Sequence, residues 1–113
     1  MTDHITITPA EGTCVVRVAG AVLGESKNAL LLKEVDYPEV IYFPRADIAM
    51  AFLEPSPTTT DCPHKGTASY FSVVVKSGTL TDAAWTYETP KAGLKEIAGY
   101  LAFQGEKVAV EQV

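Results

Sequence analysis

The chain has 113 residues, 47% of them hydrophobic and 20% charged, with a net charge of −5. This length suits one domain, over residues 1–113, and the composition excludes a disordered chain. The nine Lys and Arg residues are scattered along the sequence. Because nucleic-acid-binding proteins gather such residues on one face, we expect no nucleic-acid partner.

The sequence also argues against a membrane protein. No apolar run approaches the ~20 residues that a membrane-spanning helix needs, and the N-terminus is polar, unlike a secretory signal. Cys14 and Cys62 lie far apart with no Cys-x-x-Cys pair. We therefore expect a cytoplasmic protein with two free thiols.

The first half of the chain reads mainly as short strands. Residues 5–8 alternate apolar and polar, residues 9–12 suit a turn, and residues 13–18 suit the partner strand of a hairpin. Residues 21–23 suit another short strand. The leucine-rich run 29–33 is ambiguous between helix and strand, and its neighbours favour a strand.

The middle of the chain carries clearer boundaries. Residues 40–43 predict a strand between Pro38 and Pro44. Residues 45–53 suit one or two helical turns that end before Pro55. Residues 54–66 contain three prolines and predict a long loop, a type of segment that is often functional in so small a domain.

The last third mixes strand and helix signals. Residues 68–75 alternate, with Ala68 and Tyr70 on one face and Phe71 and Val73 on the other, and residues 83–87 suit an antiparallel neighbour. Thr89 and Pro90 are typical of a helix start. The helix pattern continues in a group of apolar residues at helical spacing: Leu94, Ile97, Ala98 and Leu101. Residues 102–103 and 108–110 suit a closing hairpin.

About eight short strands and two short helices result from this interpretation. The fold class is mainly β: a curled antiparallel sheet or sandwich with one or two short helices.

The segment from Thr60 to Gly66 is the first candidate for chemistry. His64 and Lys65 would place positive charge near the Cys62 thiol, and positive charge favours the reactive thiolate. Cys62 and His64 are thus candidate catalytic residues. Lys65 with loop amides would alternatively bind an anion, and Cys62 would alternatively be a small packed side chain.

Metal and nucleotidyl-transfer sites are not expected. The ligand types available for zinc are His4, Cys14, Cys62 and His64, and they lack the two close pairs of a structural zinc site. We expect no metal and no cofactor. Metal-dependent nucleotidyl transfer needs two neighbouring carboxylates, and none of five acidic residues is paired in that way: Asp47, Glu54, Asp61, Asp82 and Glu88.

An aromatic and charged set is the second candidate for binding. Its members are Arg45, Lys65, Tyr70, Trp85 and Glu88, with Tyr42 and Tyr87 beside them. Aromatic walls with a few charges suit a small-molecule pocket. Two structural alternatives stay open: Trp85 as the core anchor of the sheet, and Arg45 in a salt bridge.

Four segments together resemble a known bacterial family, domain of unknown function four-two-seven, also labelled nucleotidyltransferase-like. They are Tyr42-Phe43-Pro44-Arg45-x-Asp47, Leu53-x-Pro55-Ser56, Thr60-x-Cys62-Pro63-x-Lys65-Gly66-x-Ala68-x-Tyr70 and Ala84-Trp85-x-Tyr87-Glu88-x-Pro90. The resemblance implies a short cytoplasmic protein with a fold similar to the Mss4-like, or β-tent, architecture. Zinc held by two Cys-x-x-Cys pairs in other groups of that fold does not carry over, since both pairs are missing.

The sequence favours a binding module for a small anionic ligand, such as a nucleotide or a phosphorylated metabolite. The alternatives are an enzyme that uses Cys62 as nucleophile or redox centre, and an interaction or scaffold protein without a catalytic site. Unpaired edge strands would allow a homodimer, but the sequence does not determine the oligomeric state.

Overall fold

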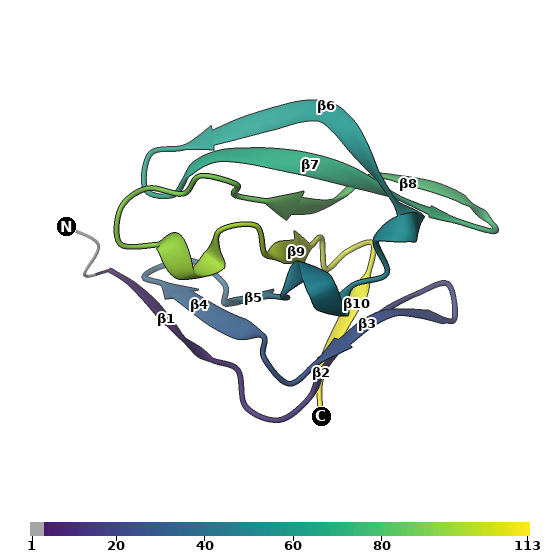
Figure 1. Cartoon of the computed structure of the whole chain (residues 1–113), viewed down its shortest axis with the longest axis horizontal. Coiled ribbons are helices and arrows are strands. Elements are labelled where there is room, and N and C mark those ends of the chain that lie inside the picture. Colours follow the sequence, from purple (N-terminus) through teal and green to yellow (C-terminus); the bar gives the residue numbers. More distant parts are fainter. Residues whose placement is uncertain (1–3) are drawn as a thin grey trace.

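The computed structural model describes residues 4–113 and is mainly β (Figure 1). This part of the chain forms ten strands in three antiparallel sheets, together with three short 3-10 turns. The prediction of a mainly β domain is confirmed. Among the described residues, no helix has the length and apolarity that a membrane crossing requires.

The first sheet contains the N-terminal strand. Its order is β1 (Ile5–Pro9), β4 (Leu30–Glu34) and β5 (Val40–Tyr42). Ile5 pairs with Glu34, and the N–H of Val35 donates to the carbonyl of His4 at 3.0 Å. The pairing therefore holds His4 beside the end of β4.

The second sheet pairs the C-terminal strand with the second strand of the chain. Its order is β10 (Ala109–Gln112), β2 (Cys14–Val18) and β3 (Ala21–Ser26). Beyond the ladder, Thr13 and Val113 exchange backbone hydrogen bonds of 3.1 and 2.8 Å.

The third sheet is the longest layer, at the top of Figure 1. Its order is β6 (Leu53–Cys62), β7 (Gly66–Val75), β8 (Gly78–Thr86) and β9 (Leu101–Phe103). A turn of three residues, 63–65, joins β6 to β7. Gly66 has a φ of +112°, which only glycine adopts readily, and so lets the chain enter β7 directly after Lys65.

Short contacts connect the sheets. Phe43 and Leu101 exchange two backbone hydrogen bonds of 2.8 and 2.9 Å, which join the first sheet to the third. The 3-10 turns lie between strands: η1 (Arg45–Asp47), η2 (Met50–Phe52) and η3 (Lys95–Ile97).

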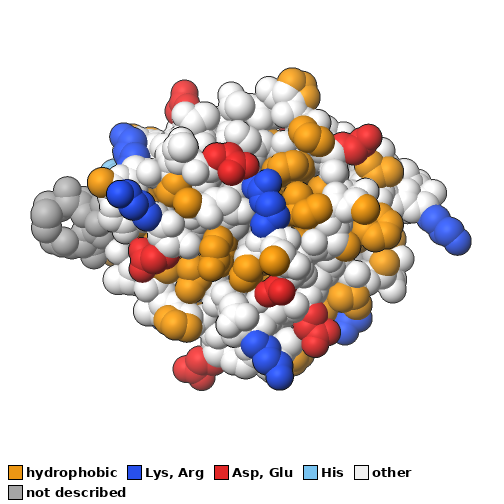
Figure 2. Space-filling view, in the orientation of Figure 1, with side chains coloured by type: hydrophobic (Ala, Val, Ile, Leu, Met, Phe, Trp, Pro, Cys, Tyr) orange, Lys and Arg blue, Asp and Glu red, His pale blue; other side chains and the backbone are white. Residues whose placement is uncertain are grey.

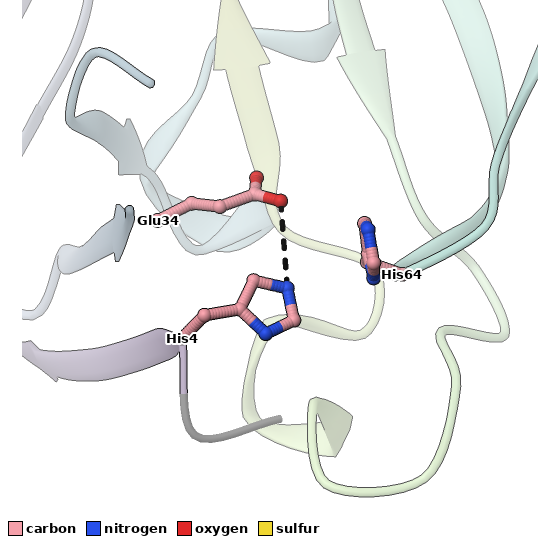
Figure 3. Close-up of side chains that lie close together, drawn as sticks. All are labelled: His4, Glu34 and His64. Carbon is pink, nitrogen blue, oxygen red and sulfur yellow. Dashed lines mark ion pairs between the residues drawn. The ribbon is translucent and has the colours of Figure 1, made fainter. Parts of the chain in front are cut away.

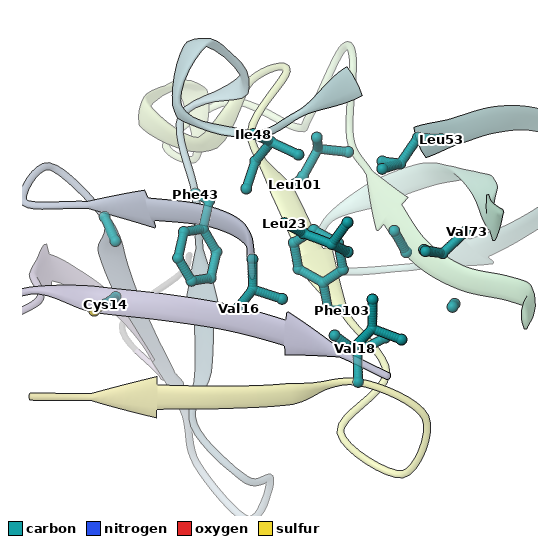
Figure 4. Close-up of a cluster of buried hydrophobic side chains, with 14 of the residues drawn as sticks. Cys14, Val16, Val18, Leu23, Phe43, Ile48, Leu53, Val73, Leu101 and Phe103 are labelled. Atoms are coloured by element: carbon teal, nitrogen blue, oxygen red, sulfur yellow. The ribbon is translucent and has the colours of Figure 1, made fainter. Parts of the chain in front are cut away.

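Two hydrophobic clusters fill the space between the layers. The larger cluster packs the second sheet against the third, with Val16, Leu23, Val73 and Phe103 among its members (Figure 4). The smaller cluster packs the first sheet and η3 against the other part of the third sheet. Its buried members are Ile5, Leu32, Tyr42, Ala68, Tyr87, Leu94, Ile97 and Ala102.

Several strand predictions are confirmed. The leucine-rich run is strand β4, and residues 40–42 are strand β5. The two faces of β7 separate as the alternation predicts, because Ala68 and Tyr70 join the smaller cluster while Phe71 and Val73 join the larger one. The helical turns predicted for residues 45–53 are the 3-10 turns η1 and η2.

The predicted N-terminal hairpin is wrong. β1 pairs with β4, whereas β2 pairs with β3 and β10 in another sheet. Ala10 is buried and its N–H donates to the carbonyl of Ala29 at 2.9 Å. The intervening segment therefore carries the chain from one sheet to the next instead of reversing it.

The predicted loop over residues 54–66 is also wrong, since residues 53–62 form β6. This strand lies at the edge of its sheet, where proline is tolerated because one side of the strand needs no hydrogen bond. Pro55 also precedes a register shift that ends at Thr59. Tertiary position has thus overridden the loop-like composition.

The predicted helix after Thr89 and the predicted closing hairpin are wrong as well. Only residues 95–97 form a turn of 3-10 helix, because Gly99 takes a φ of +76° and Leu101 already begins β9. β9 pairs with β8 and β10 pairs with β2, so the last two strands belong to different sheets.

Replacing Gly24 by alanine should destabilise the fold. A Cβ at Gly24 would lie 2.6 Å from the carbonyl oxygen of Asp47 and 2.5 Å from Ile48 Cδ1. We expect the overpacking to lower the free energy of unfolding by ~1–3 kcal/mol in urea titrations. Gly105→Ala is the control, since nothing lies within 4 Å of a Cβ there, and equal stability of the two variants would contradict this packing.

Candidate functional site

An aromatic pocket opens between the first and third sheets. Its volume is about 270 Å³. The lining residues come from β4, β5, β7, β8 and the segments beside them: Leu32, Glu34, Tyr37, Pro38, Val40, Tyr42, Lys65, Tyr70, Trp85, Tyr87 and Gln104. The strand alternation of β7 and β8 points Tyr70 and Trp85 into this space, where their ring centroids lie 6.4 Å apart.

A buried ion pair lies in the wall of the pocket. Lys65 Nζ donates to Glu34 Oε1 at 2.8 Å, and the two side chains are only 14% and 6% exposed. Burial acts to lower the pKa of Lys65. The hydrogen bond to Glu34 and the neighbouring negative groups outweigh it, so the pKa of Lys65 is raised.

The thiol of Cys62 lies on another side of the same ammonium group. Its Sγ is 3.6 Å from Lys65 Nζ, and Cys62 is half-buried at the end of β6. Cys62 also lines a second cavity of about 360 Å³ with Pro63 and Lys91. Cys14, in contrast, is fully buried in the larger hydrophobic cluster, and burial raises its pKa.

Two tyrosine hydroxyls of the pocket stay protonated at neutral pH. Burial raises the pKa values of Tyr42 and Tyr87 to about 12. Tyr42 accepts a hydrogen bond of 3.4 Å from Trp85 Nε1, which leaves its own O–H to donate. The hydroxyl of Tyr70 lies 3.1 Å from Thr60 Oγ1. The pocket therefore contains several hydroxyl donors beside the ammonium group of Lys65.

Arg45 and Glu88 are bound to each other rather than to the pocket. Arg45 donates to Glu88 at 2.9 Å and to the carbonyl of Gly99 at 3.1 Å. The guanidinium carbon lies 5.6 Å from the centre of the Phe71 ring. Of the ligand-binding residues named from the sequence, the structure brings together Lys65, Tyr70 and Trp85, while Arg45 and Glu88 do not line the pocket.

Three potential metal ligands meet at the other side of Glu34 (Figure 3). The ligand atoms of His4, Glu34 and His64 all lie within 4.8 Å of one another. His4 Nε2 is 3.8 Å from Glu34 Oε2. The rings of the two histidines pack edge to face with centroids 4.5 Å apart. Cys14, which the sequence also offered as a zinc ligand, is not part of this group, because it packs in the larger hydrophobic cluster.

A larger cavity, of about 370 Å³, lies beside β2, β3 and the end of β7. Among the residues that line it, only Lys76 is charged, and the rest are mainly apolar, including Val18, Leu23 and Phe52. The face drawn in Figure 2 carries separate Lys and Arg side chains rather than a basic patch. Of these two cavities, the aromatic pocket is the one where charge, donors and ring surfaces converge.

Sequence reasoning missed Glu34, which serves both the ion pair and the histidine cluster. It follows Leu30, Leu31, Leu32 and Lys33 at the end of a strand, and a charged residue there usually faces solvent. The one available signal was the strand alternation, which places Glu34 on the same face as the buried Leu32. Tyr37 and Gln104 of the pocket carried no sequence signal.

These features define a small all-β protein with an aromatic pocket and a buried ion pair. Residues 6–113 match the model of the family described as Domain of unknown function (DUF427). The chain belongs to this family, as the four motif segments predict. A search of curated proteins found no match to the chain.

Breaking the Lys65–Glu34 pair from one side should destabilise the protein. Lys65→Met leaves the carboxylate of Glu34 buried without a partner, and we expect a loss of about 3 kcal/mol in the free energy of unfolding. The double variant Lys65→Met/Glu34→Gln should lose at least ~1 kcal/mol less than the sum of the single variants.

The control is an ion pair of similar distance in solvent. Arg17 and Glu111 are 3.0 Å apart but about half exposed, so Arg17→Met should change stability by less than ~1 kcal/mol. Additive effects of the two substitutions at Lys65 and Glu34 would contradict the coupling.

Proposed function

We propose that this protein binds a small anionic ligand that contains a ring, such as a nucleotide or a phosphorylated metabolite, in the aromatic pocket. The observation that carries the proposal is the position of Lys65. Its ammonium group has three N–H donors, and Glu34 and Cys62 lie near it in two directions. One donor remains for a ligand oxygen.

The other polar groups of the pocket support an acceptor-rich ligand. The free O–H of Tyr42 donates, and Tyr87 stays a neutral phenol. A phosphate or carboxylate needs several donors and accepts charge-assisted hydrogen bonds from an ammonium group. Because Glu34 compensates the charge of Lys65, hydrogen-bond donors rather than a net positive charge would hold the ligand.

Size and shape support a ligand with one ring system. A volume of about 270 Å³ lies just below the ~300–1,000 Å³ usual for small-molecule sites, so the ligand has to be small. Trp85 and Tyr70 offer flat surfaces on which a base or another ring would stack. A mononucleotide-sized compound fits this description better than a dinucleotide.

The family's short name refers to nucleotidyl transfer, which supports a nucleotide-like ligand but not that reaction. In the described residues, Glu34 stands with two histidines and a lysine rather than with a second carboxylate. Metal-dependent nucleotidyl transfer uses paired carboxylates to hold its ions. We therefore propose binding of a nucleotide rather than transfer of one.

Catalysis by Cys62 is the second candidate function. The distance of 3.6 Å between its Sγ and Lys65 Nζ favours it, because an ammonium group stabilises a thiolate. His64 lies in the adjoining turn, on the exposed side. If the alkylation rate of Cys62 rises only near pH ~8.5, as for an unperturbed thiol, this alternative fails. A scaffold without any site is the third candidate.

The proposal also covers the location, fold class and oligomeric state of the protein. We propose a bacterial, cytoplasmic protein whose three sheets belong to the Mss4-like, or β-tent, class of folds. A homodimer through β6 has limited support, because Pro55 and Pro57 on that edge strand interrupt the hydrogen bonding that a second copy would need.

Binding can be measured with the protein's own fluorescence. Trp85 is the single tryptophan of the chain and lines the pocket, so AMP, UMP or ribose 5-phosphate should change its emission on binding. Adenosine, which lacks the phosphate, should bind more weakly by ~10-fold or more, since a hydrogen bond to a charged group contributes ~1.5–3 kcal/mol.

Two variants distinguish ligand binding in the pocket from attraction to positive charge elsewhere on the surface. The double variant Lys65→Met/Glu34→Gln keeps the net charge of the pair at zero and should abolish the difference between AMP and adenosine. Arg45→Ala removes a basic residue outside the pocket and should leave binding unchanged. The proposal is wrong if no phosphorylated compound in millimolar amounts alters the emission, or if both variants weaken binding equally.

A further inference from the structure

We propose that His4, Glu34 and His64 form a binding site for one divalent transition-metal ion, with Zn²⁺ as the reference ion. Three separate segments supply these residues: the position just before β1, the end of β4 and the turn between β6 and β7 (Figure 3). Their ligand atoms already converge within 4.8 Å. This ligand set differs from the cysteine-containing one in the sequence, for which no metal was expected.

An unsatisfied nitrogen points to the ligand. His4 Nε2 is buried and has no hydrogen-bond partner among the described residues. Its distance of 3.8 Å to Glu34 Oε2 is too long for a hydrogen bond, which spans ~2.7–3.2 Å. A buried polar atom without a partner is costly, and a metal ion between the nitrogen and the oxygen would satisfy both.

The separation of these two atoms suits such an ion after a small adjustment. Two bonds of ~2.0–2.1 Å at a tetrahedral angle place their ligand atoms about 3.3 Å apart. Closing the remaining gap needs a shift of about half an ångström, and a small rotation of His4 is enough. His64 is exposed, so its side chain can turn toward the ion without disturbing the core.

The Lys65 pair orients the carboxylate for this role. Lys65 holds Glu34 Oε1 at 2.8 Å and leaves Oε2 directed at His4. Glu34 is 6% exposed, so an ion at Oε2 would lie in a medium of low dielectric constant, where its interaction with the carboxylate is stronger than in water even though Lys65 compensates part of the charge. Groups that fix a metal ligand in this way strengthen metal binding.

The chemistry of the ligands selects the class of ion. Two imidazole nitrogens and one carboxylate oxygen suit Zn²⁺ and neighbouring transition metals, whereas Ca²⁺ and Mg²⁺ prefer oxygen ligands alone. Three protein ligands leave one position open, as in catalytic rather than structural zinc sites. A cavity of about 300 Å³ lined by His4, Glu34, Tyr37 and Glu39 gives an ion access to the site.

Metal binding can be observed directly at the imidazoles. His4 and His64 are the only histidines of the chain, so NMR resolves both rings in untagged protein. One equivalent of Zn²⁺ should shift the resonances of both histidines together, and calorimetry should give a stoichiometry of one. Co²⁺ should produce visible absorption that Zn²⁺ removes.

Substitutions distinguish this site from other zinc ligands. His64→Ala changes an exposed residue and should preserve the fold while weakening Zn²⁺ binding by at least ~10-fold, and His4→Ala should act similarly. Cys62→Ser and Glu39→Gln are controls for thiol binding and for general negative charge, and both should bind Zn²⁺ as the unmodified protein does.

Three results would overturn the proposal. They are a dissociation constant weaker than ~1 mM, unchanged binding in both histidine variants, and loss of binding in Cys62→Ser. Because His64 does not line the aromatic pocket, the effect of His64→Ala on Zn²⁺ is independent of whether the pocket binds AMP.

Discussion

The ammonium group of Lys65 lies 2.8 Å from the carboxylate of Glu34, and little of either side chain reaches solvent. Lys65 comes from the turn of the third sheet, and Glu34 from the last residue of β4 in the first sheet. An ion removed from water is stable only with a partner of opposite charge. The two sheets must therefore meet in one register at this point, and the aromatic pocket and the histidine cluster both depend on that register.

The two carboxylate oxygens of Glu34 have different neighbours. One oxygen binds Lys65 beside the rings of Tyr42, Tyr87 and Trp85, and the other faces His4. The two proposed sites thus share one carboxylate.

The sequence predicted the strands best where periodicity and burial agree. In β7, alternating residues face two different hydrophobic clusters, and the alternation alone predicts both faces. It failed where tertiary position overrides composition. The prolines of β6 suggest a loop but lie on an edge strand that needs fewer hydrogen bonds, and the helical spacing after Thr89 is interrupted when Leu101 pairs with Phe43.

In the candidate site, too, the sequence indicated some of the pocket residues and missed others. Lys65, Tyr70 and Trp85 were predicted from residue type and converge on one pocket. Arg45 and Glu88 have equally suitable chemistry, but their side chains meet each other instead. Glu34 was missed because its importance arises from a partner 31 residues away, and strand pairing across sheets cannot be read from local spacing.

The most direct test of this account is the ionisation of Lys65 itself. Nitrogen-15 NMR of the lysine ammonium groups, with Lys65 assigned through the loss of its signal in Lys65→Arg, follows the charge as the pH rises. We predict that Lys65 keeps its proton above its ordinary pKa of 10.5, because Glu34 stabilises the charged form. A pKa at or below 10.5 would mean that the pair does not hold the two sheets as described.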